Sequence, residues 1–292
     1  MTSVSPPTPF GVRLRAAMDE HGPLCAGLDP HRGLVEGWGL PYSLAGLERF
    51  TMTCVEAFGG HVAVVKPQSA FFEVFGSAGI TVLEKAVRAL REAGTLVLLD
   101  AKRGDIGSTM AAYAQAYLGQ DSPIAADAVT LSPYLGYGSL RPALDLAQAS
   151  GRGVFVLALT SNPEGPQVQH AQQGGRSVAG SVVDGAATDN ATAVARGELG
   201  HVGLVIGATV GAAVDDLDLD LVAAGSPVLA PGLGAQGGSV GSLRAVFGAA
   251  LPQVLASSSR DVLSAGPDVG ALRRAAVGTA DLLRDLRDRA DD

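Results

Sequence analysis

The segment "TLVLLDAKRGDIGSTM" places three charged side chains directly after an apolar run. Residues 95–99 have the character of a buried strand, and Asp100, Lys102 and Asp105 follow it. Because residues two apart on a strand point to the same side, we expect Asp100 and Lys102 to face one site. An Asp–Lys–Asp set carries a net negative charge and is costly to bury as a structural salt bridge alone. The spacing therefore predicts a functional site.

The flanking carboxylates also predict the protonation state of Lys102. Nearby opposite charges favour the ammonium form, which is a poor Schiff-base nucleophile and a good proton donor, so a lysine aldolase is disfavoured. Lysine is rare in this chain, since the 21 basic residues include only Lys66, Lys85 and Lys102. Where arginine serves as the usual cation, the remaining lysines are candidates for proton transfer. Lys66 and Lys102 follow strand-like runs, whereas Lys85 lies in a helical pattern.

Eight strand-like runs alternate with helical patterns along the chain. The runs are nearly continuous in apolar character, which is typical of parallel strands buried on both faces. Ser177 predicts a helix start, and an apolar stripe over 272–286 predicts a long last helix. Eight alternations predict an α/β protein with one (β/α)8 (TIM) barrel domain over residues 1–292. An open doubly wound sheet is the alternative, but no GxGxxG follows the first run and no linker divides the chain. The runs are 24–28, 62–66, 95–99, 127–131, 153–159, 202–207, 226–230 and 253–257.

The segment 162–176 is rich in Pro, Gly and Gln and follows the fifth predicted strand. It is predicted to be a long loop. Such a loop can serve as a lid over a site or be a tolerated surface insertion, and the sequence favours neither.

Polar residues follow at least six of the predicted strands. In a barrel these positions meet at the carboxyl-terminal face, where active sites lie. The loop "PGLGAQGGS" exposes backbone N–H groups before a helix, and the arginine of "SSSR" can bind two phosphate oxygens. Loops after strands seven and eight commonly bind phosphate, so a phosphate site is predicted here, although the glycine-rich loop alone is also consistent with turn chemistry. The polar groups at these strand ends are Asp29, Lys66, Asp100, Ser161, Arg260 and the loop "PGLGAQGGS" that begins at Pro231.

The composition excludes several other classes of protein. A net charge of −8 with scattered arginines disfavours a nucleic-acid surface. Two cysteines in apolar contexts fit a reducing compartment, and the five histidines have no metal-ligand spacing. The first residues lack the pattern of a signal peptide, and no apolar run approaches about 18 residues. We therefore expect a cytoplasmic enzyme without a membrane span or a metal.

The segment "LLDAKRGDIGST" resembles the Asp-x-Lys-x-x-Asp signature of orotidine 5′-phosphate decarboxylases. "GLDP", "VVKPQSAFFE", "TSNP", "APGLGAQGG" and "SSSR" resemble further segments of this family, so the resemblance covers nearly the whole chain. It is nearest to the longer bacterial branch. The resemblance implies conversion of orotidine 5′-phosphate to UMP and carbon dioxide, the last step of de novo UMP synthesis, without metal or organic cofactor.

The resemblance also implies roles for individual residues. Lys102 would stabilise the C6 carbanion and protonate it, and Asp100 would lie beside the scissile carboxylate. Lys66 would hydrogen-bond the ribose and the carboxylate network. Asp105, Ile106 and Thr109 resemble a segment that reaches the partner's site in a homodimer. The implied substrate contacts are Asp29 to the ribose hydroxyls, Ser161 to the pyrimidine amide edge, Pro231 to the pocket wall, and Gln236 and Arg260 to the phosphate.

Two positions leave the resemblance less specific. Thr160 precedes Ser161, and either hydroxyl could face the base. Ser259 precedes Arg260, where smaller relatives often have glycine, so a backbone contact at 259 is less secure than the role of Arg260.

Two alternatives remain open. One is a related barrel acting on a sugar phosphate, such as a keto-gulonate phosphate decarboxylase or a hexulose phosphate synthase, which shares a similar motif but binds Mg²⁺. Lys66 in "KPQSAFFE" favours the nucleotide enzyme. The other is a non-catalytic barrel that senses UMP. Binding alone would not need a net anionic group beside an anionic ligand, so the Asp100–Lys102–Asp105 set favours an enzyme.

Overall fold

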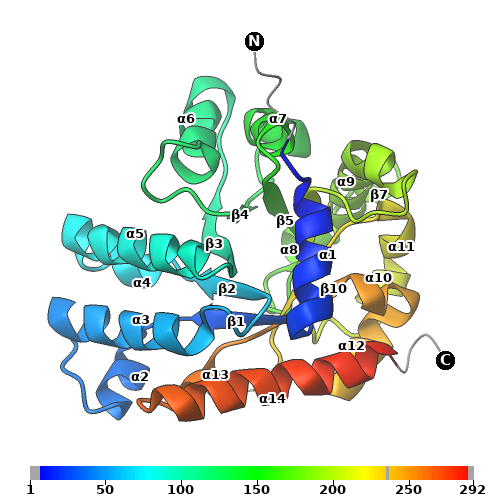
Figure 1. The fold of residues 1–292 in the computed structure, drawn as a ribbon. Helices are drawn as coiled ribbons and strands as arrows, with labels where there is room; N and C mark the ends of the chain where they lie inside the picture. Colours follow the sequence, from blue (N-terminus) through cyan, green and yellow to red (C-terminus); the bar gives the residue numbers. More distant parts are fainter. Residues whose placement is uncertain (1–6, 235–236, 289–292) are drawn as a thin grey trace.

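The computed structural model describes residues 7–234 and 237–288 and contains a closed barrel of eight parallel strands surrounded by helices (Figure 1). Around the barrel the strands follow the order β1-β10-β9-β8-β5-β4-β3-β2, so the chain winds once around it. The predicted (β/α)8 barrel is confirmed. The barrel strands are β1 (Leu24–Leu28), β2 (Val64–Pro67), β3 (Leu96–Arg103), β4 (Ala128–Leu131), β5 (Gly153–Leu159), β8 (Val202–Ile206), β9 (Val228–Pro231) and β10 (Val254–Ser258).

Both faces of the barrel strands are buried, which explains the continuous apolar runs. On β3, Leu96 and Leu98 face the barrel interior, whereas Val97 and Leu99 belong to the core between strands and helices. The interior is closed at its amino-terminal end by helix α1 (Phe10–His21), which the sequence analysis did not predict. This helix packs three buried side chains against the interior layer, namely Phe10, Leu14 and Met18.

The remaining helices cover the outside of the barrel (Figure 1). Ser177 caps α9, because its side chain accepts a hydrogen bond from the N–H of Gly180, as predicted. The predicted last helix is α14. No helix in the described ranges is long and apolar enough to cross a membrane. The helices are α2 (Arg32–Gly37), α3 (Leu44–Phe58), α4 (Ala70–Glu73), α5 (Gly76–Glu92), α6 (Gly107–Leu118), α7 (Arg141–Ala149), α8 (Pro166–Gln169), α9 (Val178–Val194), α10 (Ala213–Asp216), α11 (Leu221–Ala224), α12 (Val240–Phe247), α13 (Arg260–Leu263) and α14 (Val269–Asp288), with 3₁₀ turns η1 (Tyr137–Leu140) and η2 (Gly248–Gln253).

The segment after β5 is more ordered than the long loop that its composition predicts. It contains the short helix α8 and an antiparallel hairpin of β6 (Gln172–Gln173) and β7 (Arg176–Ser177). Gly174 and Gly175 both have positive φ, a conformation that glycine adopts without steric cost, and they form the hairpin turn. A Pro- and Gly-rich composition therefore marks tight turns here rather than a continuous irregular stretch.

Candidate active site

A cavity of about 640 Å³ opens at the carboxyl-terminal ends of the barrel strands. The sequence predicts polar residues at these strand ends, and most of the predicted residues line this cavity. Seven of the predicted site residues are among the lining: Asp29, Lys66, Asp100, Lys102, Ser161, Pro231 and Arg260.

The cavity continues the inward-facing rows of the barrel. On β3 the row runs from Leu96 and Leu98 to Asp100, and on β2 it passes from Val64 to Lys66. Successive inward positions therefore change from apolar to charged toward the mouth. The packed layer beneath gives these charged groups a rigid and poorly hydrated floor.

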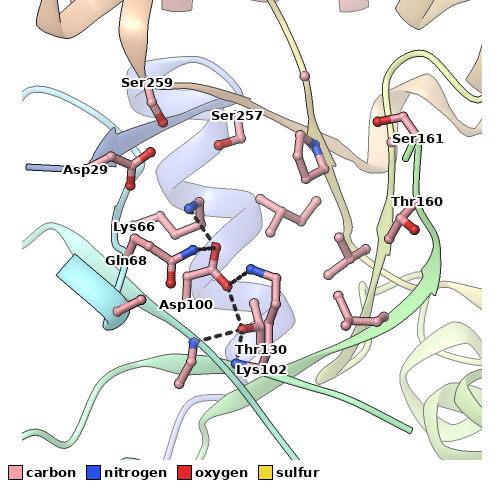
Figure 2. Close-up of a pocket in the computed structure, with 18 of the residues that line it drawn as sticks. Asp29, Lys66, Gln68, Asp100, Lys102, Thr130, Thr160, Ser161, Ser257 and Ser259 are labelled. Atoms are coloured by element: carbon pink, nitrogen blue, oxygen red, sulfur yellow. Dashed lines mark hydrogen bonds and ion pairs between the residues drawn. The ribbon is translucent and has the colours of Figure 1, made fainter. Parts of the chain in front are cut away.

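The Asp100 carboxylate is the centre of the site (Figure 2). Its Oδ2 accepts hydrogen bonds from Lys66 Nζ at 2.8 Å and from Gln68 Nε2 at 3.2 Å. Its Oδ1 accepts from Lys102 Nζ at 2.6 Å and from Thr130 Oγ1 at 2.9 Å. Four donors on one buried carboxylate fix its orientation and thereby that of both ammonium groups.

The charges in this network stabilise one another. Burial raises the pKa of Asp100, but the Lys66 and Lys102 ammonium groups outweigh burial and hold that pKa well below its usual range. Burial lowers the pKa of Lys66, but the charges of Asp100 and Asp29 outweigh it and raise that pKa above its usual range. Asp100 and Lys66 are therefore both ionised at neutral pH.

The two lysines differ in their access to solvent. The Lys66 side chain is 7% exposed, whereas the Lys102 side chain is 45% exposed. Lys66 thus serves as a buried counter-ion, while Lys102 presents its ammonium to the open part of the cavity. Of the two, Lys102 is the group that can approach a bound molecule and exchange protons with water.

Asp100 and Lys102 share the cavity, but not through the regular strand alternation that the sequence analysis assumed. Leu99 pairs with Val129 and Arg103 pairs with Leu131, so three residues of β3 between these pairs lie opposite a single residue of β4. This bulge contains Lys102, whose φ of 48° lies in the left-handed region. Bulges redirect side chains next to active sites, and this one turns Lys102 toward Asp100.

Two buried polar atoms of the cavity wall have no partner among the described residues. They are Asp29 Oδ1, at the end of β1, and His31 Nε2. A buried polar atom without a hydrogen bond is costly, and in a pocket it marks a position where a ligand group can bind. The unpartnered oxygen of Asp29 is a hydrogen-bond acceptor, so it suits a ligand hydroxyl.

The hydroxyls of Thr160 and Ser161 are in different situations. Gln169 of α8 accepts from the N–H of Thr160 at 2.8 Å and donates to its Oγ1 at 2.6 Å. Thr160 Oγ1 in turn donates to Asn162 Oδ1 at 2.7 Å. Ser161 has no such side-chain hydrogen bond to another described residue and lies across the cavity from Asp100 (Figure 2). Ser161 is therefore the hydroxyl that is free to bind a ligand.

The end of the cavity beside β9 and β10 suits an anion. Arg260 lines it, and its guanidinium makes no ion pair within the described part of the chain. Pro231 and Gly232 line the same end, while Gln236 lies outside the described residues. The Ser259 side chain packs directly against Gly27. Any larger residue at position 27 would clash with it, because a Cβ there would lie 1.8 Å from Ser259 Oγ.

Asp105, Ile106 and Thr109 are not brought to the cavity. Asp105 and Ile106 lie on the connection from β3 to α6, where Asp105 Oδ1 accepts from the N–H of Ile106 at 2.8 Å, and Thr109 lies in the first turn of α6. Within the described residues, the ion pairs of Lys102 include Asp100 but not Asp105. The expectation that two carboxylates flank Lys102 therefore holds only for Asp100 in a single chain.

The cavity also contains residues that the sequence analysis missed. Gln68 follows Lys66 by two positions at the end of β2, so strand alternation was an available signal for it, whereas His31 lies beyond β1 and is the N-cap residue of α2. Thr130 is a polar residue inside an apolar strand, and its position gives little indication of its contacts.

Comparison with known proteins assigns the chain to a family. A family model described as "Orotidine 5'-phosphate decarboxylase / HUMPS family" matches residues 22–275. The chain belongs to this family. The chain is similar to proteins named orotidine 5′-phosphate decarboxylase from Salinispora arenicola (62% identical over 268 residues, covering 91% of this chain and 94% of the relative) and Streptomyces coelicolor (59% over 271 residues, covering 92% and 94%).

Solved structures of the family share the fold over the full length. A crystal structure from Streptomyces avermitilis assigned to the same activity has a TM-score of 0.93 and is 55% identical, covering 99% of each chain. A Leishmania donovani OMP decarboxylase has a TM-score of 0.72 and is 30% identical, covering 96% of this chain and 99% of that one. The chain thus matches the family that its motifs resemble over nearly its whole length, in sequence and in fold.

Proposed function

We propose that the protein decarboxylates orotidine 5′-phosphate to UMP and carbon dioxide. The observation that carries this proposal is the position of the Lys102 ammonium. Asp100 Oδ1 holds it at 2.6 Å in the open part of a cavity whose base is the packed barrel interior. Relatives 59% and 62% identical to this chain bear the name of this activity. The proposed class is therefore a carboxy-lyase of pyrimidine biosynthesis.

The chemistry follows from the charge arrangement. Loss of carbon dioxide leaves an electron pair at C6 with no adjacent group that can delocalise it. A preorganised ammonium at Lys102 stabilises that charge and then donates a proton to C6. Asp100 orients this ammonium, and its own charge opposes the substrate more than the product, which lacks the carboxylate. Lys66 balances Asp100 from below and contacts the ribose.

The remaining substrate contacts follow the unpaired groups of the cavity. Asp29 accepts hydrogen bonds from the ribose hydroxyls through its unpartnered Oδ1. Ser161 contacts the amide edge of the pyrimidine, Pro231 lines the pocket, and Gln236 and Arg260 bind the phosphate. Binding energy from the phosphate, remote from the reacting carbon, can be used to exclude water and align C6 with Lys102.

An absorbance assay with orotidine 5′-phosphate in the presence of EDTA tests the proposal. The wild type should produce UMP, and Lys102→Ala should lose at least about 10³-fold in kcat because it removes both the charge and the proton donor. Lys85→Ala is the matched control, because Lys85 is a surface lysine paired with Glu48. It should keep the wild-type rate.

The same assay separates the two alternatives. Activity that appears only with Mg²⁺, and on sugar phosphates, would assign the protein to the metal-dependent branch. Both oxygens of Asp100 are already occupied by ammonium groups, which argues against a divalent cation at that carboxylate. Tight UMP binding without turnover would instead indicate a sensor.

We also infer that the active form is a homodimer. Three large apolar side chains are exposed on the connections after β3 and β4: Ile106 at 62%, Tyr134 at 79% and Leu135 at 53%. The two connections lie together, since the N–H of Ser132 donates to Arg103 O at 2.8 Å. An exposed apolar patch of this kind favours a protein interface. Asp105, on the same connection as Ile106, and Thr109, in the first turn of α6, would then reach the partner's cavity.

Mixing two inactive variants tests this arrangement. Lys102→Ala and Asp105→Ala should each be nearly inactive alone. In a mixed dimer one site combines the intact Lys102 of one chain with the intact Asp105 of the other, so random exchange restores about one quarter of the sites. If mixing after subunit exchange restores no activity, or if an active monomer persists at high dilution, the shared site is refuted.

A further inference from the structure

The bulge of β3 leaves two backbone donors without partners in the barrel ladder. Between the pairs Leu99–Val129 and Arg103–Leu131, the register shifts and the N–H groups of Ala101 and Lys102 have no carbonyl of β4 opposite them. Ala101 is buried, and an unsatisfied buried N–H costs about 1–3 kcal/mol. Something other than the strand pairing must therefore hold this segment in place.

A single side chain satisfies both donors. The N–H groups of Ala101 and Lys102 each donate to Thr130 Oγ1 at 3.0 Å (Figure 2). The same hydroxyl donates to Asp100 Oδ1 at 2.9 Å. A hydroxyl has one donor and two acceptor sites, so the bonding capacity of Thr130 is fully used. Thr130 is 1% exposed, and water therefore does not compete for these bonds.

Thr130 thus connects two features that define the geometry of the proton donor, the backbone at Lys102 and the Asp100 carboxylate. It fixes the backbone at Lys102, where φ is positive and the conformation is unfavourable for a residue with a side chain. It orients the carboxylate that holds the Lys102 ammonium. Its β-branched side chain has few rotamers and sits in the ordered barrel strand β4, so the support is rigid.

We propose that Thr130 is a positioning residue for the proton donor: its hydroxyl holds the β3 bulge and the Asp100 carboxylate so that the Lys102 ammonium points at the reacting carbon. The kinetic part of this inference rests on the proposed function, and the structural part does not. Without the hydroxyl, the bulge relaxes and Lys102 moves relative to Asp100. Substrate binding through the ribose and phosphate groups stays intact.

The test compares Thr130→Val, which keeps the shape and removes the hydroxyl, with Thr130→Ser, which restores the hydroxyl. Thr51→Val is the matched control, because Thr51 is fully buried and its Oγ1 has no hydrogen-bond partner among the described residues. Amide hydrogen exchange over residues 100–103 is measured without ligand. Then kcat and KM for orotidine 5′-phosphate and the Kd of UMP are measured.

For Thr130→Val we expect exchange at residues 101 and 102 to be at least about 10-fold faster. We expect kcat to fall about 10- to 100-fold, as for a small misplacement of a catalytic group, with KM and the UMP Kd within about threefold of wild type. Thr130→Ser should restore kcat and exchange to within about threefold, and Thr51→Val should leave both unchanged. If Thr130→Val does not fold, Thr130→Ala replaces it in every comparison.

Three results would overturn the inference. They are a wild-type kcat without the hydroxyl, a loss of UMP binding as large as the loss of kcat, and a Thr130→Ser variant as defective as the hydroxyl-free variant. The exchange measurement separates this inference from the proposed function. If the wild type does not act on orotidine 5′-phosphate, the proposed function is wrong. Faster amide exchange in Thr130→Val would still support the positioning role of Thr130, and unchanged exchange would refute it.

Discussion

Replacing Asp100 by asparagine should destabilise the fold strongly, because among the described residues Asp100 is the carboxylate that pairs with both Lys66 and Lys102. Lys66 is 5% exposed and cannot regain water without rearrangement of the barrel floor. Breaking a buried ion pair by removing one partner costs about 3–5 kcal/mol. The Lys102 side chain is 45% exposed, so loss of its pair adds at most about 1 kcal/mol. We therefore expect Asp100→Asn to lower the free energy of unfolding by about 3–5 kcal/mol at neutral pH, nearly all of it through Lys66.

The pH dependence of this loss has a definite sign. In the wild type, the pKa of Lys66 in the folded state is raised, so its contribution is complete below about pH 10.5 and is lost only as pH rises through the higher folded pKa. The pKa of Asp100 is lowered, so its contribution is present above about pH 4 and is lost as pH falls through the lower folded pKa. Between these limits the pair is fully ionised and the wild-type stability carries no slope from it.

In Asp100→Asn the sign for Lys66 reverses. Burial, the largest influence on Lys66, then outweighs the remaining attraction of Asp29 and lowers the pKa of Lys66 in the folded state, so the unfolded state binds more protons. The stability of the variant should therefore rise with pH, by up to about 1.4 kcal/mol per pH unit, until about pH 10.5. The difference between wild type and variant should shrink from about pH 7 to about pH 9.

Denaturant unfolding of both proteins at these two pH values is the assay. Asp121→Asn is the matched control, since Asp121 is exposed and does not line the cavity, so its change should stay within about 0.5 kcal/mol. If Asp100→Asn is as stable as the wild type at neutral pH, the pair does not stabilise the fold. If the difference grows with pH, Lys66 is not the residue left uncompensated. Either result refutes the reasoning.

Two further predictions concern the phosphate end of the cavity and the thiols. Arg260→Ala should raise KM for orotidine 5′-phosphate by about 10²-fold, because it removes charge-assisted hydrogen bonds to the phosphate. Steady-state turnover of orotidine, which lacks the phosphate, should barely change. An equal loss for both substrates would show that Arg260 does not bind the phosphate. Burial raises the pKa of the Cys25 thiol to about 12 and that of the Cys54 thiol well above its usual value. At mildly alkaline pH neither thiol should therefore react with a chromogenic thiol reagent until the protein unfolds. Rapid reaction of the folded protein, followed by absorbance, would contradict this.

The barrel could be predicted from the sequence because of how its strands are buried. Each strand packs the barrel interior on one face and helices on the other, so the runs around Leu98 and Phe155 are apolar at nearly every position. In a barrel of this class the active site lies at the carboxyl-terminal ends of the strands. The fold class therefore predicts that Asp29, Lys66 and Asp100 lie on one face. Local sequence patterns and fold topology were enough for these residues.

The detailed geometry of the site depends on contacts between distant residues and could not be predicted in that way. The conformation of Lys102 is set by the register of β3 against β4 and by a hydroxyl 28 positions away in the sequence. The Asp105 position relative to Lys102 depends, in our proposal, on a second chain. Helix α1 is a different case: Phe10, Leu14 and Met18 recur every four residues, so a helical signal was present but was not used.

The pairing of Asp100 with two lysines of unequal exposure bears directly on the proposed proton transfer. When Lys102 donates its proton to C6 it becomes a neutral amine, and a buried carboxylate that depended on Lys102 alone would be left uncompensated. Lys66 Nζ lies 2.8 Å from the other oxygen, Asp100 Oδ2, so this second ammonium can still balance the carboxylate. Because the Lys102 side chain is 45% exposed, water can return the proton once the product leaves. A buried lysine that holds the carboxylate and an accessible lysine that exchanges the proton thus perform separate tasks, and neither could replace the other without burying the proton donor or exposing the counter-ion.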